Sequence, residues 1–237
     1  DAVQLTSHQG SSWGNRMRSV DYYPEGTLLW LEADSKIREL SGGKCSLDDF
    51  VRAFHGVQDG SQVPLTYTFD DVAATLNKVQ PYDWAKFLHE RLDYTGDKLP
   101  EQGVEAAGWK LSFDDKPSSI QKAMEGLRHS ANLLYGIGFS VNRDGKLTDV
   151  QWGGPAFKAG LVPGVKLVAV NGRDYSADGL KDAIKAAKDK GGPIQLLVKN
   201  NEFFQTVSVD YHDGLRYPHL TRASGADRLG QIAAPLK

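Results

Sequence analysis

The chain has 237 residues with 28 basic and 30 acidic side chains, so its formal net charge is −2. This length suits one large or two ordinary domains, and a composition of 40% hydrophobic and 24% charged residues is typical of a soluble globular protein. No stretch approaches the roughly 18 apolar residues of a membrane helix, and the slight acidity gives no basic footprint for nucleic acid or anionic lipid. We therefore expect neither a membrane nor a nucleic acid as a partner. Cys45 is the only cysteine, which excludes an intramolecular disulfide framework and a cysteine-based zinc cluster.

Helical patterns dominate the first part of the chain. Apolar residues recur at helical spacing over residues 28–40, and a serine followed by two glycines then provides a stop signal. Ser46 with Asp49, and Thr68 with Asp71, are two capping arrangements that precede apolar runs. Each of them predicts a further helix.

A fourth helix is expected to open at Pro81 and to carry an apolar face that includes Trp84. The four helices predict a helical lobe over residues 1–99, which ends in a polar linker. From residue 100 to residue 237 the pattern changes, because polar and apolar residues begin to alternate at Trp109.

The second part of the chain reads as short strands around one helix. The helix is expected over residues 176–190, before two glycines. One helix among short strands indicates a small, partly open barrel or sandwich, so the predicted fold class is α+β. The expected strands are residues 135–141, 165–170, 194–198 and 204–209.

Four glycine-containing segments then follow one another in a recognisable order. They are Gly136-Ile137-Gly138-Phe139, residues 154–161, Pro163-Gly164 and residues 168–172. In this order, separated by strands and followed by a helix, they resemble a PDZ domain.

The PDZ resemblance implies a peptide-binding groove. Loop amides at the Gly-x-Gly-Phe motif would point at one carboxylate, and glycine leaves the space and backbone freedom that this approach needs. An extended peptide would add as a strand beside the motif, with its apolar side chain held against the predicted helix. Peptides or protein C-termini are therefore the expected partners. The candidate peptide-binding residues are Gly136, Ile137, Gly138, Phe139, Val141, Leu180 and Ile184.

An alternative interpretation of the same motif stays open. The glycines would then only form a turn, and neighbouring segments of the chain would fill the groove, since a strand edge can be covered as readily as used. On the predicted helix, Lys181, Lys185 and Lys188 recur along one face and are expected to form a solvated surface.

The flanking segments resemble a second family. Residues 21–31, with the sequence Asp-Tyr-Tyr-Pro-Glu-Gly leading into Leu-Leu-Trp-Leu, look like the region after the zinc site of glycyl aminopeptidases. Ile37-Arg38-Glu39, residues 46–50 and the tail at residues 210–220 strengthen that likeness. These enzymes are PDZ-containing gluzincin metallopeptidases. The resemblance implies a thermolysin-like catalytic domain with a His-Glu-x-x-His helix, of which the helical lobe would be the C-terminal subdomain.

The zinc motif itself is not in this chain. Two imidazoles four residues apart would be needed to reach one ion, with the intervening Glu as general base. His89-Glu90 begins such a motif, but Asp93 stands where the second histidine should be. No two histidines are four residues apart; they are His8, His55, His89, His129, His212 and His219. We therefore expect no cofactor in this chain, and zinc in a missing N-terminal portion.

One catalytic residue is implied by the resemblance. In related gluzincins a tyrosine three residues before a glycine donates a hydrogen bond to the oxyanion of the attacked peptide carbonyl, and Tyr23 stands three residues before Gly26. A neutral phenol is a suitable donor to developing negative charge. Without the resemblance, Tyr22 and Tyr23 read as aromatic packing at a helix start.

Two hypotheses on function result. In the first, the chain is the C-terminal part of a zinc aminopeptidase that prefers small N-terminal residues such as Gly or Ala, inactive alone and partnered by its missing catalytic half. Asp1 in place of an initiating methionine indicates a processed or truncated chain. The sequence leaves the compartment open between a bacterial cytoplasm and a periplasm. In the second, the chain is a non-catalytic PDZ peptide-binding module or adaptor.

Overall fold

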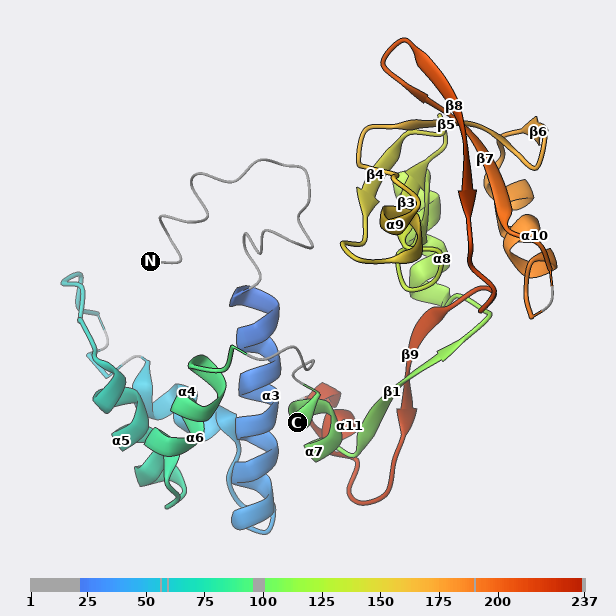
Figure 1. The fold of residues 1–237 in the computed structure, drawn as a ribbon. Helices are drawn as coiled ribbons and strands as arrows, with labels where there is room; N and C mark the ends of the chain where they lie inside the picture. The colour runs from blue at the N-terminus through green and yellow to red at the C-terminus, as the bar shows by residue number, and fades with distance from the viewer. Residues whose placement is uncertain (1–21, 56, 59, 96–100, 190, 236–237) are drawn as a thin grey trace. The chain divides into compact units, whose positions relative to one another are not determined.

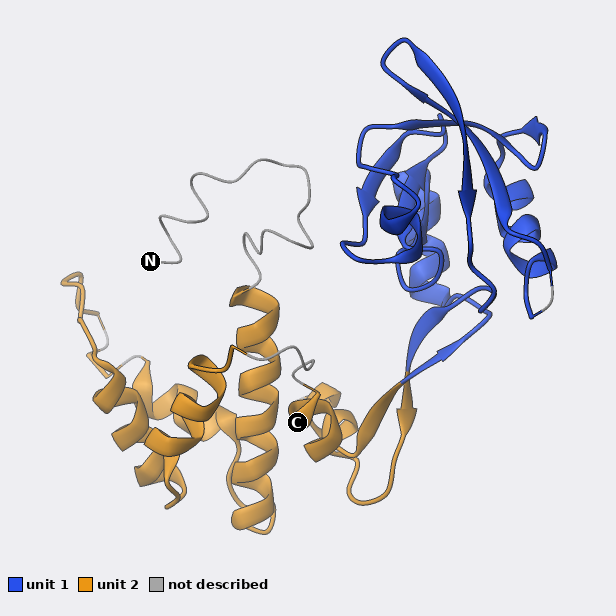
Figure 2. Ribbon diagram, viewed as in Figure 1, with its two compact units in different colours: residues 1–20, 112–219 blue, residues 21–111, 220–237 orange. Residues whose placement is uncertain are grey.

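The structure is a computed structural model that describes residues 22–55, 57–58, 60–95, 101–189 and 191–235. The chain divides into two compact units (Figure 2). Residues 21–111 together with 220–237 form a helical unit, and residues 112–219 belong to a strand-rich unit. The chain passes from one unit to the other within β1 (Trp109–Asp114) and returns within β9 (Tyr217–Arg222), and these two strands pair. Among the described helices, none has the length and apolarity to cross a bilayer.

The helical unit is built from helices that their local sequence specifies. Ser46 and Thr68 each accept a hydrogen bond from a backbone amide of the following turn, and Asp49 and Asp71 bond back to the cap amides, so both predicted capping boxes are confirmed. The other two predictions need correction at their start. The first helix begins at Tyr22 rather than at residue 28, and the fourth is capped by Asp83 rather than opened by Pro81. The helices are α3 (Tyr22–Leu40), α4 (Leu47–Phe54), α5 (Phe69–Val79), α6 (Trp84–Leu92), α7 (Gln102–Ala106) and α11 (Arg228–Ala233).

The core of the helical unit is apolar at its centre and charged along α3. Trp84, Leu76 and Ile37 are fully buried there. Glu32 is also buried, and both of its carboxylate oxygens accept hydrogen bonds from Arg91 on α6, at 2.8 and 2.6 Å. The bidentate pair satisfies a carboxylate that would otherwise be costly to bury.

Among its described residues, the strand-rich unit has two sheets and three helices (Figure 1). One sheet has the order β2-β3-β4 and the other the order β6-β5-β7-β8. The mixed helix and strand class is confirmed, and both sheets are open rather than closed into a barrel. The elements are α8 (Ser119–Arg128), β2 (Ser130–Leu133), β3 (Phe139–Asn142), β4 (Leu147–Val150), α9 (Pro155–Lys158), β5 (Lys166–Val170), β6 (Arg173–Asp174), α10 (Ala177–Ala186), β7 (Ile194–Asn200) and β8 (Phe203–Val209).

The strand predicted over residues 135–141 differs most from the structure. It begins only at Phe139, because the preceding residues form the turn between β2 and β3. Gly138 has a φ of +93°, in the left-handed region that a strand does not use. The predicted strand is therefore shortened to β3, and β2, which ends at Leu133 before the predicted range, was not predicted.

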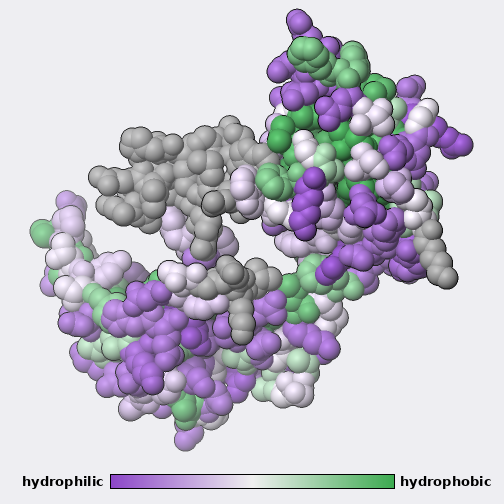
Figure 3. Space-filling view, viewed as in Figure 1, coloured by the Kyte–Doolittle hydropathy of each residue, from purple (hydrophilic) through white to green (hydrophobic). Residues whose placement is uncertain are grey.

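Apolar side chains from both sheets and from α10 form one core cluster in the strand-rich unit. Phe139, Leu167, Leu180 and Ile194 are among its fully buried members. In the view of Figure 3, more apolar surface is visible on this unit than on the helical unit. The strand-rich unit contains the larger cluster of buried apolar residues and is also where the glycine loop lies.

Candidate functional site

The glycine loop places its amide groups against the chain's own backbone. The amides of Gly136 and Gly138 both donate to the carbonyl oxygen of Leu133, at 3.1 and 3.0 Å. The carbonyl of Ile137 in turn accepts from the amide of Ala156 on α9, at 3.0 Å. Two amides that a PDZ resemblance assigns to a peptide carboxylate are thus already hydrogen-bonded to a neutral acceptor.

A tyrosine closes the loop from another side. A Cβ added at Gly136 would lie 3.1 Å from the hydroxyl of Tyr211, so any side chain there would have to displace it. The Tyr211 hydroxyl donates to the carbonyl of Gly214 at 2.8 Å, and burial raises the pKa of Tyr211 to about 12. The phenol is therefore a neutral structural donor at physiological pH.

Strand β3, the expected peptide-binding strand, is paired along both edges. On one side it pairs with β4, with a bulge, and on the other it pairs antiparallel with β2. The β2 register runs from Ser130 opposite Asn142 to Leu133 opposite Phe139. This geometry corresponds to the second interpretation of the glycine motif, in which a neighbouring segment fills the groove.

The predicted groove side chains are brought together, but inside the core. Ile137, Phe139, Val141, Leu180 and Ile184 are each no more than 1% exposed and belong to one cluster. The side chain of Leu133 from β2 lies in the same cluster. The role of these residues in peptide binding stays a prediction.

Helix α8 was missed by the sequence analysis, and it holds β2 in place. Glu125 on α8 accepts a hydrogen bond from the amide of Asn132 on β2 at 3.0 Å, and its other oxygen pairs with Lys181 on α10 at 3.1 Å. The side chains of Glu125 and Lys181 are only 13% and 21% exposed. The signal that could have found α8 is Ser118, which caps the helix by accepting from the amide of Gln121.

Lys181 also corrects the expectation of a solvated lysine face. Burial by itself lowers the pKa of Lys181, but hydrogen bonds and charges from Glu125 and Tyr217 outweigh burial and raise it above its usual value. Lys185, in contrast, is exposed and pairs with Asp182 on the surface of α10. Only part of the predicted face is therefore solvated.

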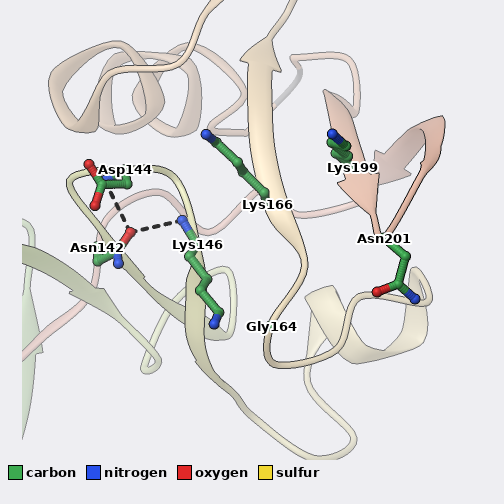
Figure 4. Close-up of a pocket in the computed structure, with 7 residues that line it drawn as sticks. All are labelled: Asn142, Asp144, Lys146, Gly164, Lys166, Lys199 and Asn201. Atoms are coloured by element: carbon green, nitrogen blue, oxygen red, sulfur yellow. Dashed lines mark hydrogen bonds between the residues drawn. The ribbon is translucent and has the colours of Figure 1, made fainter.

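A surface pocket of about 350 Å³ lies at one end of the strand-rich unit (Figure 4). Lys166 and Lys199 lie on β5 and β7, and Lys146 directly precedes β4; the side chains of Lys146 and Lys166 extend in different directions. Because the charges do not converge, the pocket has no preformed anion site. It is lined by Asn142, Asp144, Lys146, Gly164, Lys166, Lys199 and Asn201.

Tyr23, the predicted oxyanion donor, lies in the first turn of α3 and is 67% exposed. Its ring contacts that of Tyr22, with ring centroids 4.7 Å apart. The packing of these two rings therefore occurs at the surface, outside the apolar core. The catalytic role of Tyr23 stays a prediction.

The residues that the structure describes do not fit a zinc ion. Within the described ranges, no group of three or more His, Cys, Asp or Glu residues is placed to hold a metal. His89 bonds to Asp93 at 2.9 Å on the exposed face of α6, as an ordinary helix residue does. His8 lies outside the described residues.

Two comparisons with known proteins found a match. Residues 128–199 match the PDZ domain family. Among solved structures, the chain is similar to an aminopeptidase N family protein from Idiomarina loihiensis, with a TM-score of 0.62 and 17% sequence identity. That likeness covers 90% of this chain but only 36% of the other. No curated protein sequence matches the chain. Residues 128–199 therefore form a PDZ domain, and the chain shares its fold with part of an aminopeptidase N family protein.

Proposed function

We propose that this chain is the C-terminal portion of a zinc-dependent aminopeptidase that prefers small N-terminal residues such as Gly or Ala. The observation that carries the proposal is the fold likeness to an aminopeptidase N family protein, which covers 90% of the chain and so includes both units. The family resemblance of residues 21–31 adds the preference for small residues. We place zinc and the general base outside this chain, because no two of its histidines are four residues apart in the sequence.

In this proposal the helical unit contributes Tyr23 to the reaction. The phenol is neutral near pH 7 and donates a hydrogen bond to the oxyanion that forms at the attacked carbonyl. Its exposure at the start of α3 leaves the hydroxyl accessible to a substrate. Tyr22 next to it is a second accessible phenol on the same turn and provides a matched control.

The first experiment assays the chain alone against glycyl and alanyl p-nitroanilides with added zinc. We expect no turnover, and we expect turnover when the chain is part of the longer protein that carries the metal ligands. Hydrolysis by the isolated chain that a chelator abolishes would contradict the proposal.

The second experiment tests Tyr23 in that longer protein. Tyr23→Phe removes the hydroxyl, and the loss of one oxyanion donor lowers kcat by roughly 10²- to 10³-fold. Tyr22→Phe should leave kcat within about twofold. Equal effects of the two substitutions on kcat would contradict a specific hydrogen bond from Tyr23 to the oxyanion. They would indicate that both phenols only stabilise the first turn of α3.

A second candidate function is a PDZ peptide-binding module or adaptor. The Gly-x-Gly-Phe loop of the PDZ domain favours it, since PDZ domains bind extended peptides along a strand edge. The pairing of β3 on both sides opposes it in the conformation described. The two candidates are separated by a peptide titration, which requires no enzymatic activity.

A further inference from the structure

We propose that β2 is an intramolecular ligand of the PDZ groove, and that the segment α8–β2 must leave β3 before a free peptide can bind. The proposal goes beyond the aminopeptidase function and does not depend on it, because it concerns only residues 112–219. The ligand class it assigns is a peptide with a free C-terminal carboxylate and an aliphatic last residue.

The first argument is the direction and position of β2. It runs antiparallel to β3, and its C-terminal residue, Leu133, lies at the glycine loop opposite Phe139. A peptide that added to this strand edge would make the same ladder of backbone hydrogen bonds. A strand edge accepts one neighbour, so β2 and a free peptide exclude each other.

The second argument is the chemistry at the loop. The carbonyl oxygen of Leu133 accepts from the amides of both Gly136 and Gly138, where a terminal carboxylate would be bound. Hydrogen bonds to a charged acceptor are stronger than those to a neutral one, so a free carboxylate would gain more from these two donors. The Leu133 side chain is 2% exposed in one cluster with Leu180 and Ile184, which indicates an aliphatic pocket.

The third argument is that α8 is weakly anchored. None of its residues is buried, and Ile120 and Leu127 are 75% and 77% exposed. The described polar ties of this segment to its neighbours include Glu125 with Lys181 on α10 and Asn132 with Ser140 on β3. A helix without a buried face contributes little packing energy, so its detachment costs less than that of a core element.

The test is a titration with a fluorescent decapeptide that ends in Ser-Ala-Asn-Leu with a free carboxylate, which copies β2. We expect the wild-type chain to bind it more weakly than about 1 mM. Glu125→Ala removes the tie from α8 to α10 and to the Asn132 amide, and it should raise the affinity at least about tenfold by increasing the open fraction. The matched control, Asp182→Ala, removes the exposed partner of Lys185 and should bind like the wild type.

Three further measurements decide the outcome. The same peptide with a C-terminal amide should not bind Glu125→Ala, because the loop amides then lack a charged acceptor. If Glu125→Ala does not fold, the same titration uses Lys181→Met, which removes the ion pair between α10 and Glu125 from the other side. In a Glu125→Ala, Cys45→Ser background, a disulfide between Asn132→Cys and Ser140→Cys, opposite residues on β2 and β3, should abolish binding, and reduction should restore it. Binding to the locked protein, or no binding by any folded release variant, would overturn the proposal.

Discussion

The two units of the chain are stabilised in different ways. In the helical unit, α3 buries Glu32 and Asp34, and these carboxylates are held by Arg91 and Arg38. In the strand-rich unit, none of the described charged residues is buried as Glu32 and Asp34 are, and the core consists of apolar side chains. The helical unit therefore combines an apolar core with two buried carboxylates in ion pairs, whereas the strand-rich unit packs apolar side chains from segments distant in the sequence.

The comparison also bears on function. The glycine loop and β3 lie within the apolar interior, so their backbone donors are used for folding unless β2 leaves. Tyr23 lies at the surface of the other unit, where it is free of the core. The covered groove is tested by peptide binding after β2 is released. The exposed Tyr23 is tested by its effect on kcat.

The largest expected effect is in the apolar core. Phe139→Ala empties a site that is 0% exposed, and such truncations cost about 3–5 kcal/mol of unfolding free energy. Amide hydrogen exchange of β7 measures it. Phe203→Ala, on a side chain that is 78% exposed, should change stability by less than about 0.5 kcal/mol. Similar costs at the two positions would refute the assignment of Phe139 to the core.

The next effect tests the buried ion pair of the helical unit. Glu32→Leu leaves Arg91 partly buried without its partner and should cost about 3 kcal/mol in urea unfolding. The double variant with Arg91→Leu should recover most of that loss, because replacing both charges by apolar groups is often neutral. A double variant as unstable as the single one would show that the charge pair is not what stabilises this contact. Glu39→Gln, which breaks an exposed pair with Lys36, is the control.

The smallest effect concerns a helix cap. Thr68→Ala should cost about 1 kcal/mol, since the Thr68 hydroxyl caps α5. Hydrogen bonds from the Thr68 side chain and amide lower the pKa of Asp71 below its usual 3.8. The contribution of Asp71 is therefore fully present above the unfolded-state pKa and is lost as the pH falls through the lower folded-state pKa. Urea unfolding between pH 6 and 2 should show this slope in the wild type and a smaller slope in Asp71→Asn.

The helices of the first unit could be predicted because their signals are local. A cap residue and its partner three positions later act within one turn, so Ser46 and Thr68 were sufficient to place α4 and α5. The start of α3 was predicted six residues too late, at residue 28, because the apolar spacing that indicated the helix begins only there. The order of the glycine motifs over residues 136–172 can also be read directly from the sequence, and it was sufficient to predict the PDZ domain.

The sequence by itself determined the glycine loop, the capped helices and the candidate groove residues. The tertiary structure alone decided that β2 occupies the edge of β3 and that Glu125 bonds to Lys181, 56 positions along the chain. The physical reason is that a strand edge has no preference for its partner in its own sequence. Backbone donors and acceptors pair with whichever extended segment the fold brings alongside, and here that segment is the chain's own residues 130–133.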